Sequence, residues 1–202
     1  MALKAVFFDV GETLVDEDGY WRRVARLIGA PQHVVLAALG VTIARGEHHT
    51  RLFDHLGVER PDAVGAVVYG RGELYPDAVP CLARLRREGY RVGVAGNQTA
   101  ALERWARDEG LPVDVIGSSA SWGVEKPARA FFERMVVEAG CEPDEVAYVG
   151  DRIDNDVLPA AEAGLVPIHV RRGPWGMLQE EGAARHLCIG RLSELPEFLH
   201  GL

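Results

Sequence analysis

The stretch AVFFDVGETL, residues 5–14, decides the fold: a continuous apolar run ends in Asp9, and Gly11 and Thr13 follow it. Short runs of mostly apolar residues recur downstream, at residues 91–95, 113–116, 146–149 and 166–170. Continuous apolar runs are typical of strands buried on both faces of a parallel sheet. Because helical patterns separate the later runs, the sequence predicts an α/β fold with a doubly wound parallel sheet of five strands. A ligand site is then expected beyond the carboxyl ends of the central strands.

The region between the first two predicted strands breaks this alternation. It has no convincing strand pattern, but it holds amphipathic helical stretches at residues 20–28, 34–44, 49–56 and 62–69. We therefore predict a helical insert over residues 16–72, with residues 1–15 and 73–202 forming the α/β domain. His48, His49 and His55 fall in this insert, and we interpret them as a solvated helix face rather than as a metal site.

The composition is that of an ordinary globular protein, with 202 residues, 48% hydrophobic and 26% charged. The formal net charge is −8, and no basic run stands out, so we expect no nucleic-acid partner. The apolar run near the N-terminus is too short for a signal peptide or a membrane span. The 3 cysteines are odd in number and widely separated, which favours a reducing compartment, and we predict a cytoplasmic protein without a membrane partner.

Polar residues that can carry chemistry follow four of the predicted strands. In chain order they are Asp9 after the first strand, Gly96 and Asn97 after the second, Lys126 and Pro127 after the third, and Gly150, Asp151 and Asp156 after the fourth. An aspartate after a buried strand is by itself more often a turn or cap residue than a nucleophile. The ordered set is far more specific than any one of its members.

This ordered set resembles the haloacid dehalogenase superfamily of hydrolases, and the resemblance covers the whole chain. It implies that the insert is a helical cap, that Asp9 is the nucleophile and that Lys126 neutralises the phosphoryl oxygens of a substrate. It also implies a Mg²⁺ site made by Asp9, the backbone carbonyl of Gly11 and Asp151, with Asp156 as a further ligand or as support.

Elementary geometry agrees with such a metal site. Neighbouring strands of a parallel sheet lie about 4.8 Å apart, so pairing of the first and fourth strands would bring Asp9 close to Asp151 and Asp156. Carboxylates that close together cannot all ionise unless a cation joins them. A hard divalent cation such as Mg²⁺ suits carboxylates, a carbonyl and a substrate phosphate.

Substrate contacts are expected from the loops after the second, third and fifth strands. Backbone N–H groups around Gly96 and Asn97, together with Lys126, could bind the phosphoryl oxygens. Arg171 lies in the loop after the fifth strand and could attract an anionic substrate, although an ordinary surface arginine explains it equally well. Trp175, in the same loop, could line the cleft or pin the loop.

Two positions depart from the pattern of the superfamily. Its phosphatases usually carry a second aspartate two residues after the nucleophile as general acid and base, and Gly11 stands there. Gly96 stands where a serine or threonine is usual. Four outcomes remain open: another carboxylate substitutes, from Glu12, Asp16, Glu17 or the cap; the leaving group needs no proton; the reaction is not at phosphorus and a halide leaves; or turnover is weak or absent.

We predict a Mg²⁺-dependent hydrolase of the phosphatase type, which cleaves the phosphomonoester of a small phosphorylated molecule through an aspartyl-phosphate on Asp9. The first alternative is a catalytically weak or inactive module that binds a phosphorylated ligand or a protein. The second is a metal-independent hydrolase of the dehalogenase type.

Overall fold

The sheet is the centre of the computed structural model, which describes residues 2–70, 72–179 and 187–201. Its strands run in the order β3-β2-β1-β4-β5-β6, and every neighbouring pair is parallel. Their bounds are β1 Ala5–Phe8, β2 Arg91–Gly96, β3 Val115–Ser118, β4 Val146–Gly150, β5 Val166–Val170 and β6 Leu187–Ile189. The predicted doubly wound α/β fold is confirmed, because the chain winds outward from β1 in both directions.

The predicted number of five strands was wrong, since the sheet has six. The additional strand, β6, is 3 residues long and lies at the edge beside β5. So short a run has no periodic signal in the sequence, and pairing with the backbone of β5 defines it. The third strand also lies two residues later than expected, because Asp114 is used in a loop contact in which its carboxylate accepts from the N–H of Val92.

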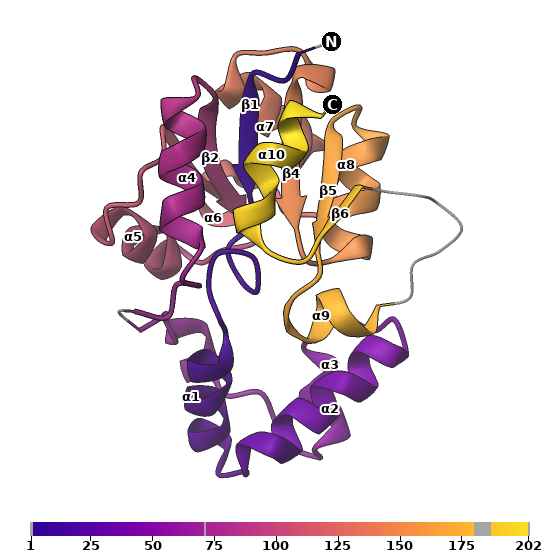
Figure 1. Cartoon of the computed structure of the whole chain (residues 1–202). Coiled ribbons are helices and arrows are strands. Elements are labelled where there is room, and N and C mark those ends of the chain that lie inside the picture. Colours follow the sequence, from indigo (N-terminus) through magenta and orange to yellow (C-terminus); the bar gives the residue numbers. More distant parts are fainter. Residues whose placement is uncertain (1, 71, 180–186, 202) are drawn as a thin grey trace.

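Helices cover both faces of the sheet (Figure 1). One face packs against α4 (Ala78–Arg87), α5 (Ala100–Asp108) and α10 (Leu195–His200), and the other against α7 (Arg129–Ala139) and α8 (Leu158–Glu162). The short helix α6 (Ser119–Trp122) follows β3. Successive residues of β1 alternate between the two apolar clusters, as strand geometry requires: Val6 and Phe8 face one cluster, and Phe7 faces the other.

The segment between β1 and α4 holds helices α1 (Asp18–Ile28), α2 (Gln32–Ala44) and α3 (Arg51–His55). In Figure 1 these indigo and purple helices lie beyond the carboxyl ends of the strands. They share an apolar cluster of their own, to which α9 (Gly173–Leu178) contributes Trp175. Trp175 therefore packs α9 against the helices of this segment. The division of the chain at residues 16 and 72 stays a prediction.

The last helical stretch expected in this segment, residues 62–69, is shorter than predicted. It forms a single 3-10 helix, Asp62–Ala66, and then continues as extended backbone. Gly65 and the β-branched Val64, Val67 and Val68 all disfavour a longer α-helix. The chain is thereby free to lead Tyr69 back toward β1, where its ring joins the main core.

Within the described part of the chain, no single helix has the length and apolar character to cross a membrane, and by those two criteria only the bent pair α1 and α2, at 107°, passes when taken together.

Candidate active site

Asp9 occupies the first position after the central strand β1. Its N–H donates to the carbonyl of Val149 at 2.9 Å, so the β1–β4 ladder fixes its backbone. β1 pairs with β2 on one side and β4 on the other, and Asp9 therefore emerges between the carboxyl ends of three strands. Asp9 is buried, with a relative exposure of 8% for the whole residue, and it lines a cavity of about 410 Å³.

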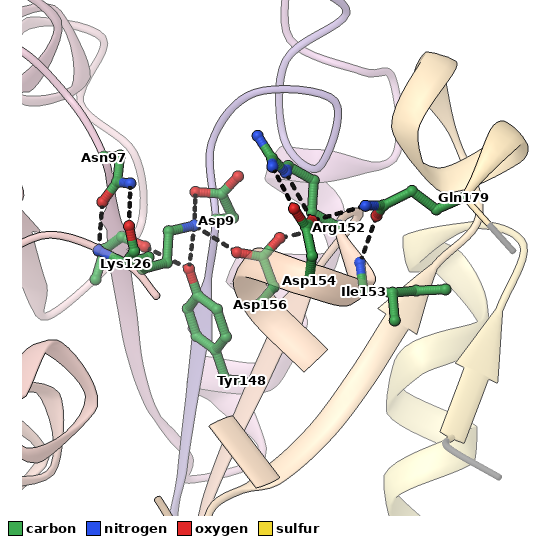
Figure 2. Close-up of polar contacts among 10 residues, drawn as sticks. Asp9, Asn97, Lys126, Tyr148, Arg152, Ile153, Asp154, Asp156 and Gln179 are labelled. Atoms are coloured by element: carbon green, nitrogen blue, oxygen red, sulfur yellow. Dashed lines mark hydrogen bonds and ion pairs between the residues drawn. The ribbon is translucent and has the colours of Figure 1, made fainter. Parts of the chain in front are cut away.

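Lys126 reaches the Asp9 carboxylate from the loop after α6 (Figure 2). Its Nζ donates to Asp9 Oδ1 at 2.8 Å, to Asp156 Oδ1 at 2.5 Å and to the Tyr148 hydroxyl at 2.9 Å. The Tyr148 hydroxyl in turn donates to the carbonyl of Ala95 at 2.8 Å. All the donors of the ammonium group thus have a partner, and its position is fixed without substrate.

Asn97 holds the backbone of Lys126 in place. The N–H of Lys126 donates to Asn97 Oδ1 at 2.8 Å, and Asn97 Nδ2 donates to the carbonyl of Lys126 at 2.9 Å. This reciprocal pair occupies both ends of the amide, although Asn97 also borders the cavity. The amide side chain therefore positions the lysine.

Asp151 follows β4 directly, and Asp156 lies in the π-helical turn Ile153–Val157 that comes next. One carboxylate oxygen from each of Asp9, Asp151 and Asp156 lies within 4.8 Å of the others. Asp156 is fully buried, and its second oxygen accepts from the N–H of Arg152 at 3.0 Å. A Cβ at Gly150 would lie 2.3 Å from Asp156 Oδ2, so glycine is needed there for the close approach.

Burial and charge act against each other in this lysine cluster, by which we mean Asp9, Lys126, Asp151 and Asp156. Burial lowers the pKa of Lys126, but Asp156 and Asp9 raise it by more, so the lysine is an ammonium ion. Burial raises the pKa of Asp9, and the Lys126 ammonium opposes that rise. Burial and the charges of Asp156 and Asp9 raise the pKa of Asp151 well above its usual range.

The lysine cluster fits a divalent cation. It brings three buried carboxylates to a single ammonium group, so with all of them ionised it carries excess negative charge. Asp156 has both oxygens engaged by Lys126 and Arg152, whereas one oxygen of Asp9 and the carboxylate of Asp151 remain for a metal. Oxygen ligands of this kind suit Mg²⁺.

Glu12 and Glu17 form a second acidic group beside Gly11, and each accepts from a tyrosine hydroxyl at 2.6 Å, Glu12 from Tyr75 and Glu17 from Tyr69. Burial raises the pKa of Glu12 to about 7 and that of Glu17 to about 8. Both glutamates line the cavity. Asp16, the other nearby candidate for the missing acid, is exposed and accepts from the N–H of Asp18 at the start of α1.

Gly96 and Arg171, the two remaining residues predicted to bind substrate, differ in their surroundings. Gly96 lies against the nucleophile, since a Cβ there would come 2.4 Å from Asp9 Oδ1. Arg171 is exposed and is not among the residues that line the cavity. Another arginine, Arg152, does line it; its guanidinium lies over the ring of Trp175 at 3.7 Å and pairs with Asp154 at 2.6 Å.

Residues of the helical segment close the cavity on the side opposite the sheet. Tyr20, Trp21 and residues 46–49 line it. His49 is half-buried there, and burial and the neighbouring His48 lower its pKa to about 3. The prediction that this histidine lies on a solvated helix face was therefore wrong, because the turn before α3 directs it inward.

Tyr148 and Tyr69 are two of the site residues that sequence reasoning missed. Tyr148 lies in a strand read as uniformly apolar, and a hydroxyl in such a run is the signal that could have drawn attention to it. Tyr69 lies 52 residues from its partner Glu17, so no local pattern could connect the two.

Comparison with known proteins agrees with the geometry of the site. A family model described as haloacid dehalogenase-like hydrolase matches residues 3–164. The chain belongs to this family. The glyceraldehyde 3-phosphate phosphatase of Methanopyrus kandleri is 29% identical, and the alignment covers 86% of this chain and 86% of that protein. This chain is thus a haloacid dehalogenase-like hydrolase of the phosphatase type.

Solved structures share the fold of this family member. A phosphatase from Thermococcus onnurineus superposes with a TM-score of 0.66 at 23% identity, covering 98% of this chain and 99% of that one. The L-2-haloacid dehalogenase of Xanthobacter autotrophicus superposes with a TM-score of 0.72 at 19% identity, covering 99% of both chains. Phosphatases and dehalogenases thus share this fold, and side chains must distinguish their chemistry.

Proposed function

We propose that this protein is a Mg²⁺-dependent phosphatase that hydrolyses the phosphomonoester of a small molecule through an aspartyl-phosphate on Asp9. The observation that carries this proposal is the lysine cluster, in which a nucleophilic carboxylate faces a cavity beside one buried ammonium and two further carboxylates. A halide leaves as an anion without phosphoryl charge to neutralise, so such a site favours phosphorus over carbon as the centre attacked.

Each side chain of the site has its own role in the proposed reaction. Asp9 attacks phosphorus through its carboxylate, and the hydrogen bond from Lys126 to Asp9 Oδ1 keeps the nucleophile in one orientation. Asp9, Asp151 and the carbonyl of Gly11 would hold Mg²⁺, with Asp156 in support. When bound, this ion neutralises charge on the transferring group. Water then cleaves the aspartyl-phosphate and restores the carboxylate.

Residues 16–72 serve as the cap in this proposal, and residues 1–15 and 73–202 as the catalytic domain. Aromatic and histidine side chains of the cap segment line the cavity opposite Asp9, which supports a role in excluding water and choosing the substrate. The M. kandleri relative is named for glyceraldehyde 3-phosphate. A three-carbon phosphate of that kind is therefore the first substrate to test, and a cavity of about 410 Å³ has room for it.

The test measures hydrolysis of glyceraldehyde 3-phosphate, an alkyl phosphate and an aryl phosphate, each with Mg²⁺ and with chelator. We expect turnover that needs the metal and is abolished in Asp9→Asn. Turnover that survives in Asp9→Asn would place the nucleophile elsewhere. Halide release without a metal effect would support the dehalogenase alternative, and phosphate binding without turnover would support the binding module.

A further inference from the structure

The position of Gly11 is filled by a side chain from elsewhere. Gly11 has no left-handed backbone angle, so its conformation is open to any residue. A Cβ at this position would nevertheless lie 2.3 Å from Glu17 Oε1 and 3.2 Å from the Tyr69 hydroxyl. The carboxyl group of Glu17 thus occupies the space into which a side chain two residues after the nucleophile would extend.

Contacts from the far end of the helical segment fix this carboxyl group. The Tyr69 hydroxyl donates to Glu17 Oε1 at 2.6 Å. The ring of Tyr69 is buried and packs edge-on against Trp105, with ring centroids 5.1 Å apart, and against Tyr20 at 5.9 Å. Glu17 therefore has a defined position at the cavity wall without any charged partner among its hydrogen bonds in the described part of the chain.

The other carboxylates that line the cavity are engaged or placed differently. Glu12 accepts from Tyr75 and packs against Gly173, where a Cβ would come 2.5 Å from it, so its side chain points toward α9. Glu47 pairs with His55 at 2.6 Å, and Asp154 pairs with Arg152. Glu125 is exposed. Asp9 and Asp151 belong to the lysine cluster.

We propose that Glu17 is the general acid and general base of the reaction and takes the part that the missing side chain at Gly11 cannot play. This inference rests on the proposed function. In the first step the P–O bond to the leaving group breaks as the bond from Asp9 to phosphorus forms, and the Glu17 carboxyl gives its proton to the leaving oxygen. In the second step the Glu17 carboxylate accepts a proton from the attacking water, and inorganic phosphate leaves.

The two steps predict different effects for Glu17→Gln, because an alkoxide needs a proton to leave and an aryl oxide does not. We expect kcat/KM for an alkyl phosphate to fall by about 10²- to 10⁴-fold. For an aryl phosphate kcat/KM, which reports the first step, changes less than about tenfold. For the same aryl phosphate, kcat falls by more than kcat/KM does, because the second step lacks a base.

A rapid-mixing experiment with the aryl phosphate separates the steps directly. Glu17→Gln should release one equivalent of aryl alcohol per protein in a burst, followed by slow turnover, and phosphate should remain bound to the protein. Asp16→Asn, a change in an exposed carboxylate one residue away, is the matched control and should behave as the parent protein. The burst is counted per folded protein, so partial unfolding does not imitate it.

Moving the carboxylate is the second test. The single variant Gly11→Asp should hydrolyse the alkyl phosphate more slowly than the parent protein, since the new Cβ would meet the carboxyl group of Glu17. The double variant Gly11→Asp with Glu17→Ala should hydrolyse the alkyl phosphate at least tenfold faster than Glu17→Ala.

If Glu17→Gln lost activity equally on both esters and gave no burst, the role of Glu17 would be overturned. The role would also be overturned if Glu12→Gln, and not Glu17→Gln, gave the selective loss on the alkyl phosphate with a burst on the aryl phosphate. Failure of the proposed function itself would look different, because Asp9→Asn would then leave hydrolysis intact.

Discussion

Two groups of carboxylates line the same cavity, and they have different hydrogen-bond partners. The lysine cluster satisfies Asp9 and Asp156 with the ammonium of Lys126, 2.8 Å and 2.5 Å away. The tyrosine pair, Glu12 and Glu17, is satisfied by two phenol hydroxyls. A cation favours the ionised form of a carboxyl group, whereas a buried site without a cation favours the neutral form.

The difference separates a nucleophile from a proton carrier within one cavity. An ionised carboxylate can attack phosphorus but has no proton to give, and a neutral carboxyl group has the proton but is a poor nucleophile. Lys126 opposes the rise that burial causes in the pKa of Asp9, whereas no cation is hydrogen-bonded to Glu17 in the described part of the chain. Environments that differ in this way are a recurrent means of giving neighbouring carboxyl groups different roles. The predictions below test this contrast.

The largest effect is expected from Lys126→Met in the presence of chelator. It removes the ammonium group and leaves buried carboxylates without their partner, which costs about 3–5 kcal/mol of unfolding free energy. Titration with denaturant measures this loss of unfolding free energy. Lys4→Met, which breaks the exposed pair with Glu145, is the control and should leave stability close to that of the parent protein. A loss no greater than the control's would contradict the account of the lysine cluster.

Metal binding should distinguish the two carboxylate groups next. Saturation with Mg²⁺ at 100 times its Kd should stabilise the protein by about 2.7 kcal/mol, measured as a rise in Tm. Asp151→Asn should abolish this rise and should raise the Tm in chelator, because it removes a carboxyl group whose ionised form is disfavoured by burial and by Asp156 and Asp9. Asp154→Asn, in the same loop but paired with Arg152, should keep the response to Mg²⁺. An unchanged response in Asp151→Asn would rule that residue out as a ligand.

The pH dependence of stability reports on the histidine in the cavity wall. Burial, His48 and nearby arginines lower the pKa of His49 to about 3, whereas the unfolded chain has a pKa near 6.5. Between those values the unfolded state binds more protons, so the contribution of His49 to stability falls as pH falls below about 7. His49→Gln should therefore flatten the decline in Tm from pH 7 to pH 4. The exposed His33→Gln is the control and should leave it unchanged.

The smallest effect is expected from removing single phenol hydroxyls. Tyr69→Phe keeps the ring but loses the donor to Glu17, so alkyl phosphate hydrolysis should slow by about fivefold, as for one neutral hydrogen bond. Tyr75→Phe, which removes the donor to Glu12, should slow it less than twofold. Equal effects in steady-state kinetics would mean that the two glutamates are not functionally distinct.

The sequence was informative where a residue lies next to a strand and poor where partners come from distant loops. Asp9 and Asp151 each follow an apolar run, so strand pairing alone predicted their proximity, and the acidic cluster bears this out. Substrate binding by the backbone around Asn97 stays a prediction, but no sequence pattern indicated that the side-chain amide of Asn97 holds the backbone of Lys126. No linear pattern encodes a side chain–backbone contact across 29 residues.

The sequence by itself determined the parallel sheet, the family and the order of the charged residues along the edge of the sheet, because buried strands and short loops impose a local pattern on the chain. Only the tertiary structure decided which of Glu12, Asp16 and Glu17 faces Gly11. That choice depends on how the segment between β1 and α4 folds back: Tyr69 returns to the site and binds Glu17, while Asp16 remains exposed. Three neighbouring carboxylates of equal chemistry differ only in their surroundings, and packing between distant segments creates those surroundings.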